Sequence, residues 1–274
     1  MKSNRIVEYK DAKSFLDNYV KNKSDYIYIH YARQNCFEDA YEKGPRIIII
    51  AAMNAGNEQT MLFSLKKIAD AYGIDFFEIS ESEQDEIEME MLQQFFEYAE
   101  NNAQKKWLHW NMKNNNFGFS AIEERYHNLG GNVRHINENN LFNISQILKK
   151  KYGDHYAKDA VWNGKMMGKM YDIFQMNKIE DSKILNGEQE IKEYILRNFT
   201  SIEQSTFGKV KAFKVLVEKA VDNDLKVRGN IFKDVYGLSI SGIAQFIQDN
   251  AILAFLFSIL GGVIATLLCK FVGI

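Results

Sequence analysis

The segment Arg46–Ala52, RIIIIAA, decides the fold class of this 274-residue chain. A continuous run of apolar, mostly β-branched residues of this length is typical of a strand that is buried on both faces. The turn Met53–Glu58 follows, and then an amphipathic pattern over Gln59–Tyr72 predicts a helix. A buried strand that leads through a short turn into a helix indicates a sheet covered by helices, which is an α/β fold.

Strand and helix patterns alternate on both sides of this segment. Four further stretches are rich in β-branched and aromatic residues and predict strands: Tyr26–Tyr31, Ile74–Ile79, Lys106–Trp110 and Val133–Ile136. Three other stretches have helical periodicity: Asp11–Lys21, Glu83–Gln104 and Gly118–Leu129. Because parallel strands need helical crossovers, this order predicts a Rossmann-like or flavodoxin-like α/β domain with a mostly parallel sheet.

The strand patterns stop near Asn137, and helical patterns continue. These patterns cover Asn143–Tyr152, Tyr156–Asn177, Gly187–Phe199 and Ser201–Asn223. We therefore divide the chain into four parts. They are a Rossmann-like α/β domain (1–136), a helical region (137–230), an amphipathic interfacial helix (231–249) and a transmembrane tail anchor (250–274).

The anchor contains the segment AILAFLFSILGGVIATLLC, which is uncharged over the nineteen residues 251–269. As a helix this segment reaches about 28 Å, the thickness of one bilayer core, so it predicts a transmembrane helix. Small residues recur in it every four positions, at Ala254, Ser258, Gly262 and Thr266. Such a stripe lets membrane helices approach closely and predicts a homo-oligomer; the alternative is that small residues are simply common in membrane helices.

Composition and charge limit the cellular location and the binding partners that we expect for this protein. The formal net charge of −2 gives no support for direct nucleic-acid binding, and two cysteines are too few for a disulfide framework. The N-terminal segment lacks the apolar core of a secretory signal. We therefore expect a single-pass protein of the cell inner membrane, with the bulk of the chain in the cytoplasm. Membrane lipids are then partners, and Lys149, Lys150 and Lys151 are candidate contacts with anionic headgroups, unless they form a solvent-facing helix end.

Candidate catalytic residues follow the fourth predicted strand. His109 and Asn111, at its carboxyl end, would supply a general base and a hydrogen-bond donor to a substrate; alternatively, His109 is a core histidine. In the next helix Glu123, Glu124 and His127 are crowded together. Glu123 and His127 are four residues apart, as in a metal pair or a charge pair, but no metal-binding motif accompanies them, so we predict no metal. The alternative is a solvated helix face.

Candidate ligand-binding residues lie in the turn after the second predicted strand. Asn54, Gly56 and Asn57 precede the predicted helix, whose free backbone N–H groups would hold a phosphate or another anion. The alternative is an ordinary strand-to-helix turn, in which Asn and Gly are favoured without any ligand. His30, near the end of the first predicted strand, would join His109 in a shared cleft. No motif identifies a cofactor.

The segment WLHWNMKNNNFGFSAIEERYHNLGG (107–131) resembles a segment of bacterial proteins that have no established activity. The general plan of the chain is a cytosolic α/β domain followed by an apolar C-terminal segment. This plan resembles that of bacterial antiviral effectors that join a cytosolic α/β or sensing domain to a terminal membrane segment, including those partnered with short Argonautes or with cyclic-nucleotide signalling. The resemblance implies an effector that senses a protein partner or nucleotide signal, oligomerises and depolarises the inner membrane. The alternatives are a membrane-tethered hydrolase acting on a nucleotide, NAD or a nucleic acid, and a membrane scaffold.

Overall fold

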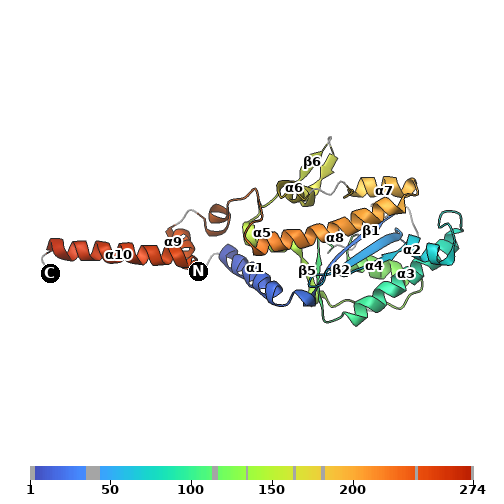
Figure 1. Cartoon of the computed structure of the whole chain (residues 1–274), viewed down its shortest axis with the longest axis horizontal. Helices are drawn as coiled ribbons and strands as arrows, with labels where there is room; N and C mark the ends of the chain where they lie inside the picture. Colours follow the sequence, from blue (N-terminus) through green and yellow to red (C-terminus); the bar gives the residue numbers. More distant parts are fainter. Residues whose placement is uncertain are drawn as a thin grey trace.

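The computed structural model describes residues 4–34, 44–112, 117–133, 135–162, 165–179, 183–237 and 240–272 of the chain. An α/β body holds the central sheet, and the C-terminal helix α10 (Ala251–Val272) extends away from this body, as Figure 1 shows. The sheet has five strands in the order β3-β2-β1-β4-β5. The α/β fold class predicted from the sequence is therefore confirmed.

The sheet is mixed in direction, so the prediction of a mostly parallel sheet is wrong. Its strands are β1 (Tyr26–Arg33), β2 (Ile47–Asn54), β3 (Thr60–Ser64), β4 (Lys106–His109) and β5 (Leu141–Asn143). β4 runs parallel to β1 and β5, whereas β2 runs antiparallel to β1 and β3. A tight turn joins β2 to β3, and only antiparallel strands can be joined in this way. An apolar pattern identifies a strand but not its direction.

The stretch Gln59–Tyr72, predicted as one helix, is divided between β3 and the helix α2 (Leu65–Tyr72). The Ser64 hydroxyl accepts a hydrogen bond from the Lys67 N–H and so begins α2. Gly73 ends the helix in the left-handed conformation, with φ of 69°. The helical pattern was therefore correct only after the N-cap serine.

Two predicted strands are absent from the described part of the chain. Ile74–Ile79 is a series of turns, and the described residues of Val133–Ile136 have no regular structure. The apolar side chains of both stretches nevertheless pack against the core. An apolar side chain can be buried without its backbone pairing in a sheet, and sequence periodicity does not separate the two cases.

Helices cover both faces of the sheet. What we call the α3 face packs against α3 (Glu81–Asn101), α2 and α4 (Phe119–Asn128), and the α8 face packs against α1 (Asn4–Lys21), α5 (Ile144–Tyr152) and α8 (Phe199–Val221). In β1, Ile27 and Ile29 point to the α3 face, whereas Tyr26 and Tyr28 point to the α8 face. All eight residues of β1 are buried, as expected for a strand between two helical layers.

Between α5 and α8 the chain forms a small two-stranded sheet and two helices. These elements are β6 (Ala160–Trp162), β7 (Lys165–Met167), α6 (Gly168–Met176) and α7 (Gly187–Ile195). The prediction of one helix over Tyr156–Asn177 is therefore correct only in its second half. Two short 3-10 helices, η1 (Lys23–Asp25) and η3 (Glu138–Asn140), precede β1 and β5.

The body is joined to α10 through a π-helical turn, η4 (Phe232–Tyr236), and the helix α9 (Ile240–Asp249). The Phe246 ring of α9 packs on those of Phe232 and Tyr236, with ring centroids 4.9 and 5.2 Å apart. Asp249 also forms an ion pair with Lys10 of α1, at 2.9 Å. These contacts attach α9 firmly to the body.

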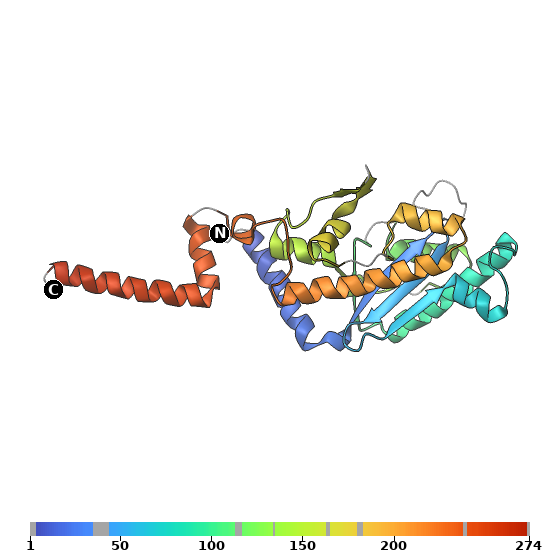
Figure 2. The same ribbon diagram turned by 45° about the horizontal axis from the view of Figure 1, so that its top comes forward.

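The two C-terminal helices meet at a sharp bend, which Figure 2 shows from a second direction. Within the described residues, no single helix is both long enough and apolar enough to cross a membrane. Gly242–Asp249 and Ala251–Ile264 together meet the length and composition needed, with a bend of 108° between them.

Candidate functional site

His30 and His109 lie on opposite faces of the sheet, so the predicted cleft between them does not form. In the parallel pairing of β1 with β4, the partner of His109 is Ile29, and paired residues project to the same face. His30 therefore points to the α8 face, with its ring centroid 5.7 Å from that of Phe213, whereas His109 packs 5.6 Å from Phe119 of α4. Burial lowers the pKa of His30 well below its ordinary value, so its imidazole is neutral.

His109 and Asn111, at the end of β4, both form hydrogen bonds that hold the local fold together. His109 is fully buried, and its Nδ1 accepts a hydrogen bond from the Met112 N–H at 3.1 Å. Asn111 and Asn143 form a reciprocal pair: Asn143 Nδ2 donates to Asn111 Oδ1 at 2.9 Å, and the Asn111 N–H donates to Asn143 Oδ1 at 3.2 Å. These contacts support the alternative that His109 is a core histidine, because a substrate in solvent cannot reach a fully buried imidazole.

The predicted residues of α4 do come together, around a partner that sequence reasoning missed. Glu123 does not pair with His127; its Oε2 lies 2.7 Å from Nδ1 of His135. The segment after Gly130 and Gly131 folds back along α4 and brings His135 to this carboxylate. Gly131 allows that return, because a Cβ there would lie 2.2 Å from the Tyr126 ring. The spacing of His135 from Glu123 has no helical period that would reveal the pair.

Two adjoining hollows surround the Glu123–His135 pair. One, of about 310 Å³, is also lined by Ser120, and the other, of about 850 Å³, adds Glu124 and His127. Glu123 is 15% exposed and His135 is 80% exposed, so the carboxylate holds one side of an imidazole whose other nitrogen faces solvent. A carboxylate-oriented imidazole of this kind can accept a proton from water or a hydroxyl. The described residues contain no group of three or more ligands that would hold a metal ion.

The turn that was predicted to bind an anion is a hairpin loop between β2 and β3. Asn54 Oδ1 accepts hydrogen bonds from the N–H groups of Gly56 and Asn57, at 2.9 and 3.2 Å. No helix begins here, so the helix dipole on which the anion prediction depended is absent from this turn. Gly56 has a packing role instead, because a Cβ there would lie 3.0 Å from the Ser24 backbone.

The three consecutive lysines at the end of α5 do not act as one group. Lys149 is exposed and pairs with Asp154 at 3.0 Å, and Lys150 is half-buried. Lys151 is only 4% exposed; its ammonium donates to the Ala220 carbonyl at the end of α8 and to Asn223 Oδ1. Its prediction as a lipid contact is therefore wrong, because the side chain points into the body.

A buried ion cluster, which sequence reasoning missed, ties three elements together on the α3 face. Glu88 of α3 is fully buried and accepts hydrogen bonds from Arg46 at 3.1 Å, from Arg125 at 2.6 Å and from the Ile47 N–H at 2.7 Å. Asp85 contacts the same two arginines, at 2.9 and 3.0 Å. Burial raises the pKa of Glu88, against the opposing effect of the arginines. The two arginines balance the charge of the two carboxylates. We therefore interpret the cluster as a structural cross-link between α3, α4 and the start of β2.

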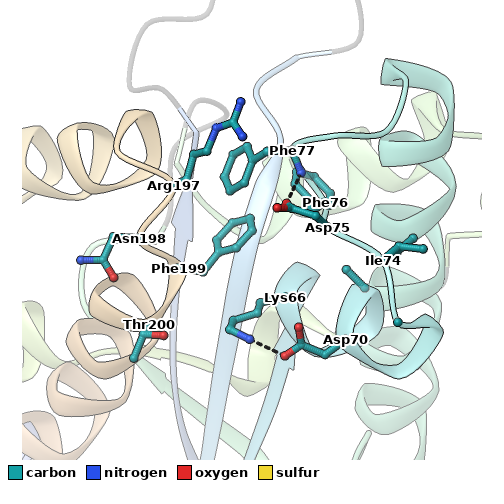
Figure 3. Close-up of a pocket in the computed structure, with 12 residues that line it drawn as sticks. Lys66, Asp70, Ile74, Asp75, Phe76, Phe77, Arg197, Asn198, Phe199 and Thr200 are labelled. Carbon is teal, nitrogen blue, oxygen red and sulfur yellow. Dashed lines mark hydrogen bonds and ion pairs between the residues drawn. The ribbon is translucent and has the colours of Figure 1, made fainter.

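The cavity in Figure 3 is lined by aromatic, basic, acidic and polar side chains. It measures about 630 Å³ and lies between the α2–α3 connection and the junction of α7 with α8. Phe77 and Phe199 stack at its centre with ring centroids 4.9 Å apart, and Phe76 packs edge-on against Phe199. Figure 3 shows these rings between Arg197 and Lys66. Sequence reasoning missed this cavity because its two walls are far apart along the chain.

Comparison with known proteins adds no assignment to these sites. No protein-family model matches the chain, and no curated protein is significantly similar to it. Functional inference therefore depends on the residues of this chain alone.

Proposed function

We propose that this protein attaches to a membrane through α10 and holds its α/β body at the cytoplasmic surface of the cell inner membrane. The observation that carries the proposal is the exposure of α10. Its large apolar side chains face solvent, with exposed fractions of 73% for Ile252, 65% for Phe255, 57% for Leu260 and 53% for Val263. An apolar surface of this extent on a single helix is unfavourable in water and is typical of membrane or protein contact.

The composition of α10 favours a bilayer over a soluble partner. The 22-residue helix carries no acidic residue, and Ser258, a polar residue within it, donates to the Ala254 carbonyl at 2.6 Å. Such internal hydrogen bonding is what a polar side chain needs in hydrocarbon. The helix α9, amphipathic and nearly perpendicular to α10, then lies along the membrane surface.

Membrane attachment is tested by charge placed within α10. The double variant Leu256→Asp/Leu260→Asp should lose membrane association in liposome flotation, because each carboxylate near the bilayer centre costs about 3 kcal/mol. The matched control is Ile195→Asp/Leu196→Asp, which changes two exposed apolar residues on the body. Retention of the α10 variant in the floated fraction would contradict the proposal.

The architecture supports a second step, in which the protein is an effector of bacterial antiviral defence. A protein partner or small ligand bound by the body would promote association of α10 helices, and the assembly would depolarise the membrane. Ala254, Ser258 and Gly262 lie on one stripe of α10, and a Cβ added at Gly261 or Gly262 would contact nothing within 4 Å. The side chain of Thr266, the fourth residue of the stripe, lies outside the described residues.

The effector step is tested with a membrane-potential dye in cells that express the full chain. Gly262→Leu should abolish both crosslinked oligomers and depolarisation, because it fills the stripe at which helices would approach. Leu260→Phe, which adds bulk on another side of α10, is the control. Depolarisation that persists in Gly262→Leu would overturn the effector step, and membrane binding without depolarisation by the wild type would indicate a scaffold.

The Glu123–His135 pair favours a second candidate function, a membrane-tethered hydrolase acting on a nucleotide, NAD or a nucleic acid. His135 would accept the proton of an attacking water, and Glu123 would orient its ring. Hydrolysis by the full-length protein should fall at least about a hundredfold in His135→Gln and remain in His127→Gln, a histidine of the same hollow. Equal activity of the two variants would exclude this assignment.

A further inference from the structure

The cavity beside Arg197 has the parts of a small-molecule site, and it lies at the opposite end of the body from α10 (Figures 1 and 2). We propose that it binds a planar aromatic anion, with the ring against Phe77 and Phe199 and the acidic group at Arg197. Its volume of about 630 Å³ falls within the range of ligand pockets. The site does not depend on membrane attachment.

The aromatic wall supplies a binding surface for a ring. Phe77 and Phe199 stack with an interplanar angle of 23°, and Phe76 and Tyr194 hold them from the sides, edge-on. Phe199 is only 6% exposed, so the wall is fixed by packing. Phe77 is half-buried, so part of its ring remains available. A flat ring that packs against the exposed edge of Phe77 gains an aromatic contact and apolar burial.

Arg197 supplies the positive charge at the mouth of the cavity. Its guanidinium lies 5.3 Å from the centre of the Phe77 ring, so an anion bound there would adjoin a ring stacked on the wall. A planar guanidinium matches the geometry of carboxylate and phosphate groups. Lys66 adds a second cation at the other end of the cavity.

The acidic residues near the cavity leave room for such a ligand. Arg197 pairs with Glu78, which is 65% exposed, and Lys66 pairs with Asp70, which is 60% exposed. Ion pairs at this exposure are screened by water and contribute little, so an anion in the cavity displaces them at small cost. Asp75 also lines the cavity, but its carboxylate accepts the Phe77 N–H at 2.9 Å and is held in that turn.

The backbone conformation at Arg197 allows a substitution that removes the side chain without straining the fold. Arg197 has φ of 58° and follows the end of α7, where the Asn198 N–H donates to the Glu193 carbonyl and the Arg197 N–H to that of Tyr194. This is the helix-end motif that favours glycine. Arg197→Gly therefore removes the guanidinium and also relieves the backbone strain of a positive φ. Lys178, with φ of 53° in the same motif after α6, gives the matched control Lys178→Gly.

The test is calorimetric titration of the full chain in detergent micelles with four probes. AMP and indole-3-acetate carry both a ring and an anion, whereas adenosine carries the ring alone and inorganic phosphate the anion alone. We expect AMP or indole-3-acetate to bind at least about tenfold more tightly than either single-feature probe, because both contacts are then made. Binding of AMP alone would identify a nucleotide site, and binding of indole-3-acetate alone a site for aromatic acids.

The variants locate the binding. Arg197→Gly should weaken the binding of the ring-plus-anion probe by roughly tenfold or more, and Lys178→Gly should leave it unchanged. Thermal unfolding followed by circular dichroism confirms that both variants are folded. The proposal is overturned if neither AMP nor indole-3-acetate binds, if adenosine binds as tightly as AMP, or if the two glycine variants have the same effect.

Discussion

The two faces of the sheet bury charge in different ways. On the α3 face, Arg46, Asp85, Glu88 and Arg125 form a cluster in which opposite charges balance. On the α8 face, Lys151 is buried against a backbone carbonyl and an amide oxygen, with no carboxylate among its described hydrogen-bond partners. The ion cluster stabilises the fold only while all four charged groups are present. The buried Lys151 ammonium, in contrast, lowers stability because its charge is removed from water without a carboxylate bonded to it among the described residues. Mutations should therefore act in opposite directions on the two faces.

The largest effect is expected from Glu88→Gln. The variant removes one of the two described carboxylates that balance two buried arginines, and such a loss costs about 3–5 kcal/mol of unfolding free energy. Chemical denaturation monitored by circular dichroism measures the change. Glu86→Gln, an exposed position on the same helix, is the control and should change stability by less than about 0.5 kcal/mol. Similar losses in both variants would show that the ion cluster is not a cross-link.

A smaller effect, but a more specific one, is expected from the pair of changes Glu88→Gln and Arg125→Met. Because Arg125 has lost its main partner in Glu88→Gln, removing it as well should cost less than it does in the wild type. The double-mutant cycle should give a coupling energy of about 1–3 kcal/mol. Additive effects, within about 0.5 kcal/mol, would contradict direct coupling.

Lys151→Met should have the opposite sign at neutral pH. Burial, with a smaller contribution from Lys13, lowers the pKa of Lys151 to about 8, although Asp17 opposes this. Removing the charge relieves that cost but also removes the bonds to Ala220 and Asn223. The net result should be a gain of up to about 2 kcal/mol in unfolding free energy at pH 7.

The pH dependence of stability separates this explanation from simple repacking. Between the folded pKa of about 8 and the higher unfolded value, the unfolded chain holds a proton that folded Lys151 has released. The unfolding free energy of the wild type should therefore rise between pH 8 and pH 9.5, and that of Lys151→Met should rise less. Parallel curves for the two proteins would contradict the lowered pKa. Tyr19 and Tyr156, whose pKa values burial raises to about 12, affect stability only at higher pH.

The smallest effect is expected where charges meet at the surface. Glu78→Gln removes the carboxylate that pairs with Arg197, and both side chains are more than half exposed. The unfolding free energy should change by less than about 0.5 kcal/mol, because water screens such pairs. A loss above about 1.5 kcal/mol in the same denaturation assay would mean that surface and buried pairs in this protein are equivalent.

The sequence allowed the fold class to be predicted because β1, β2 and β4 are apolar runs of strand length. It did not allow strand direction to be predicted, since Ile47–Asn54 has the same side-chain pattern in a parallel or an antiparallel sheet. Nor did it separate buried from solvated charge: Glu86 and Glu88 are two residues apart on one helix, and only Glu88 is buried. The candidate site was predicted in part, because Glu123, Glu124 and His127 are close together in the sequence. His135 and the Arg197 cavity could not be predicted, because segments distant in the sequence come together there only in the tertiary structure.

The attachment of α9 to the body has a consequence for how the molecule searches its surroundings. Phe246 and Asp249 fix α9 against η4 and α1, and α10 leaves at 108°. If α10 runs along the bilayer normal, the body cannot tumble on a slack tether, and every copy keeps one orientation toward the lipid. The Arg197 cavity, at the far end of α8, then opens away from the bilayer. In that arrangement a dissolved ligand would reach the cavity by diffusion in three dimensions, whereas the protein itself would diffuse in two.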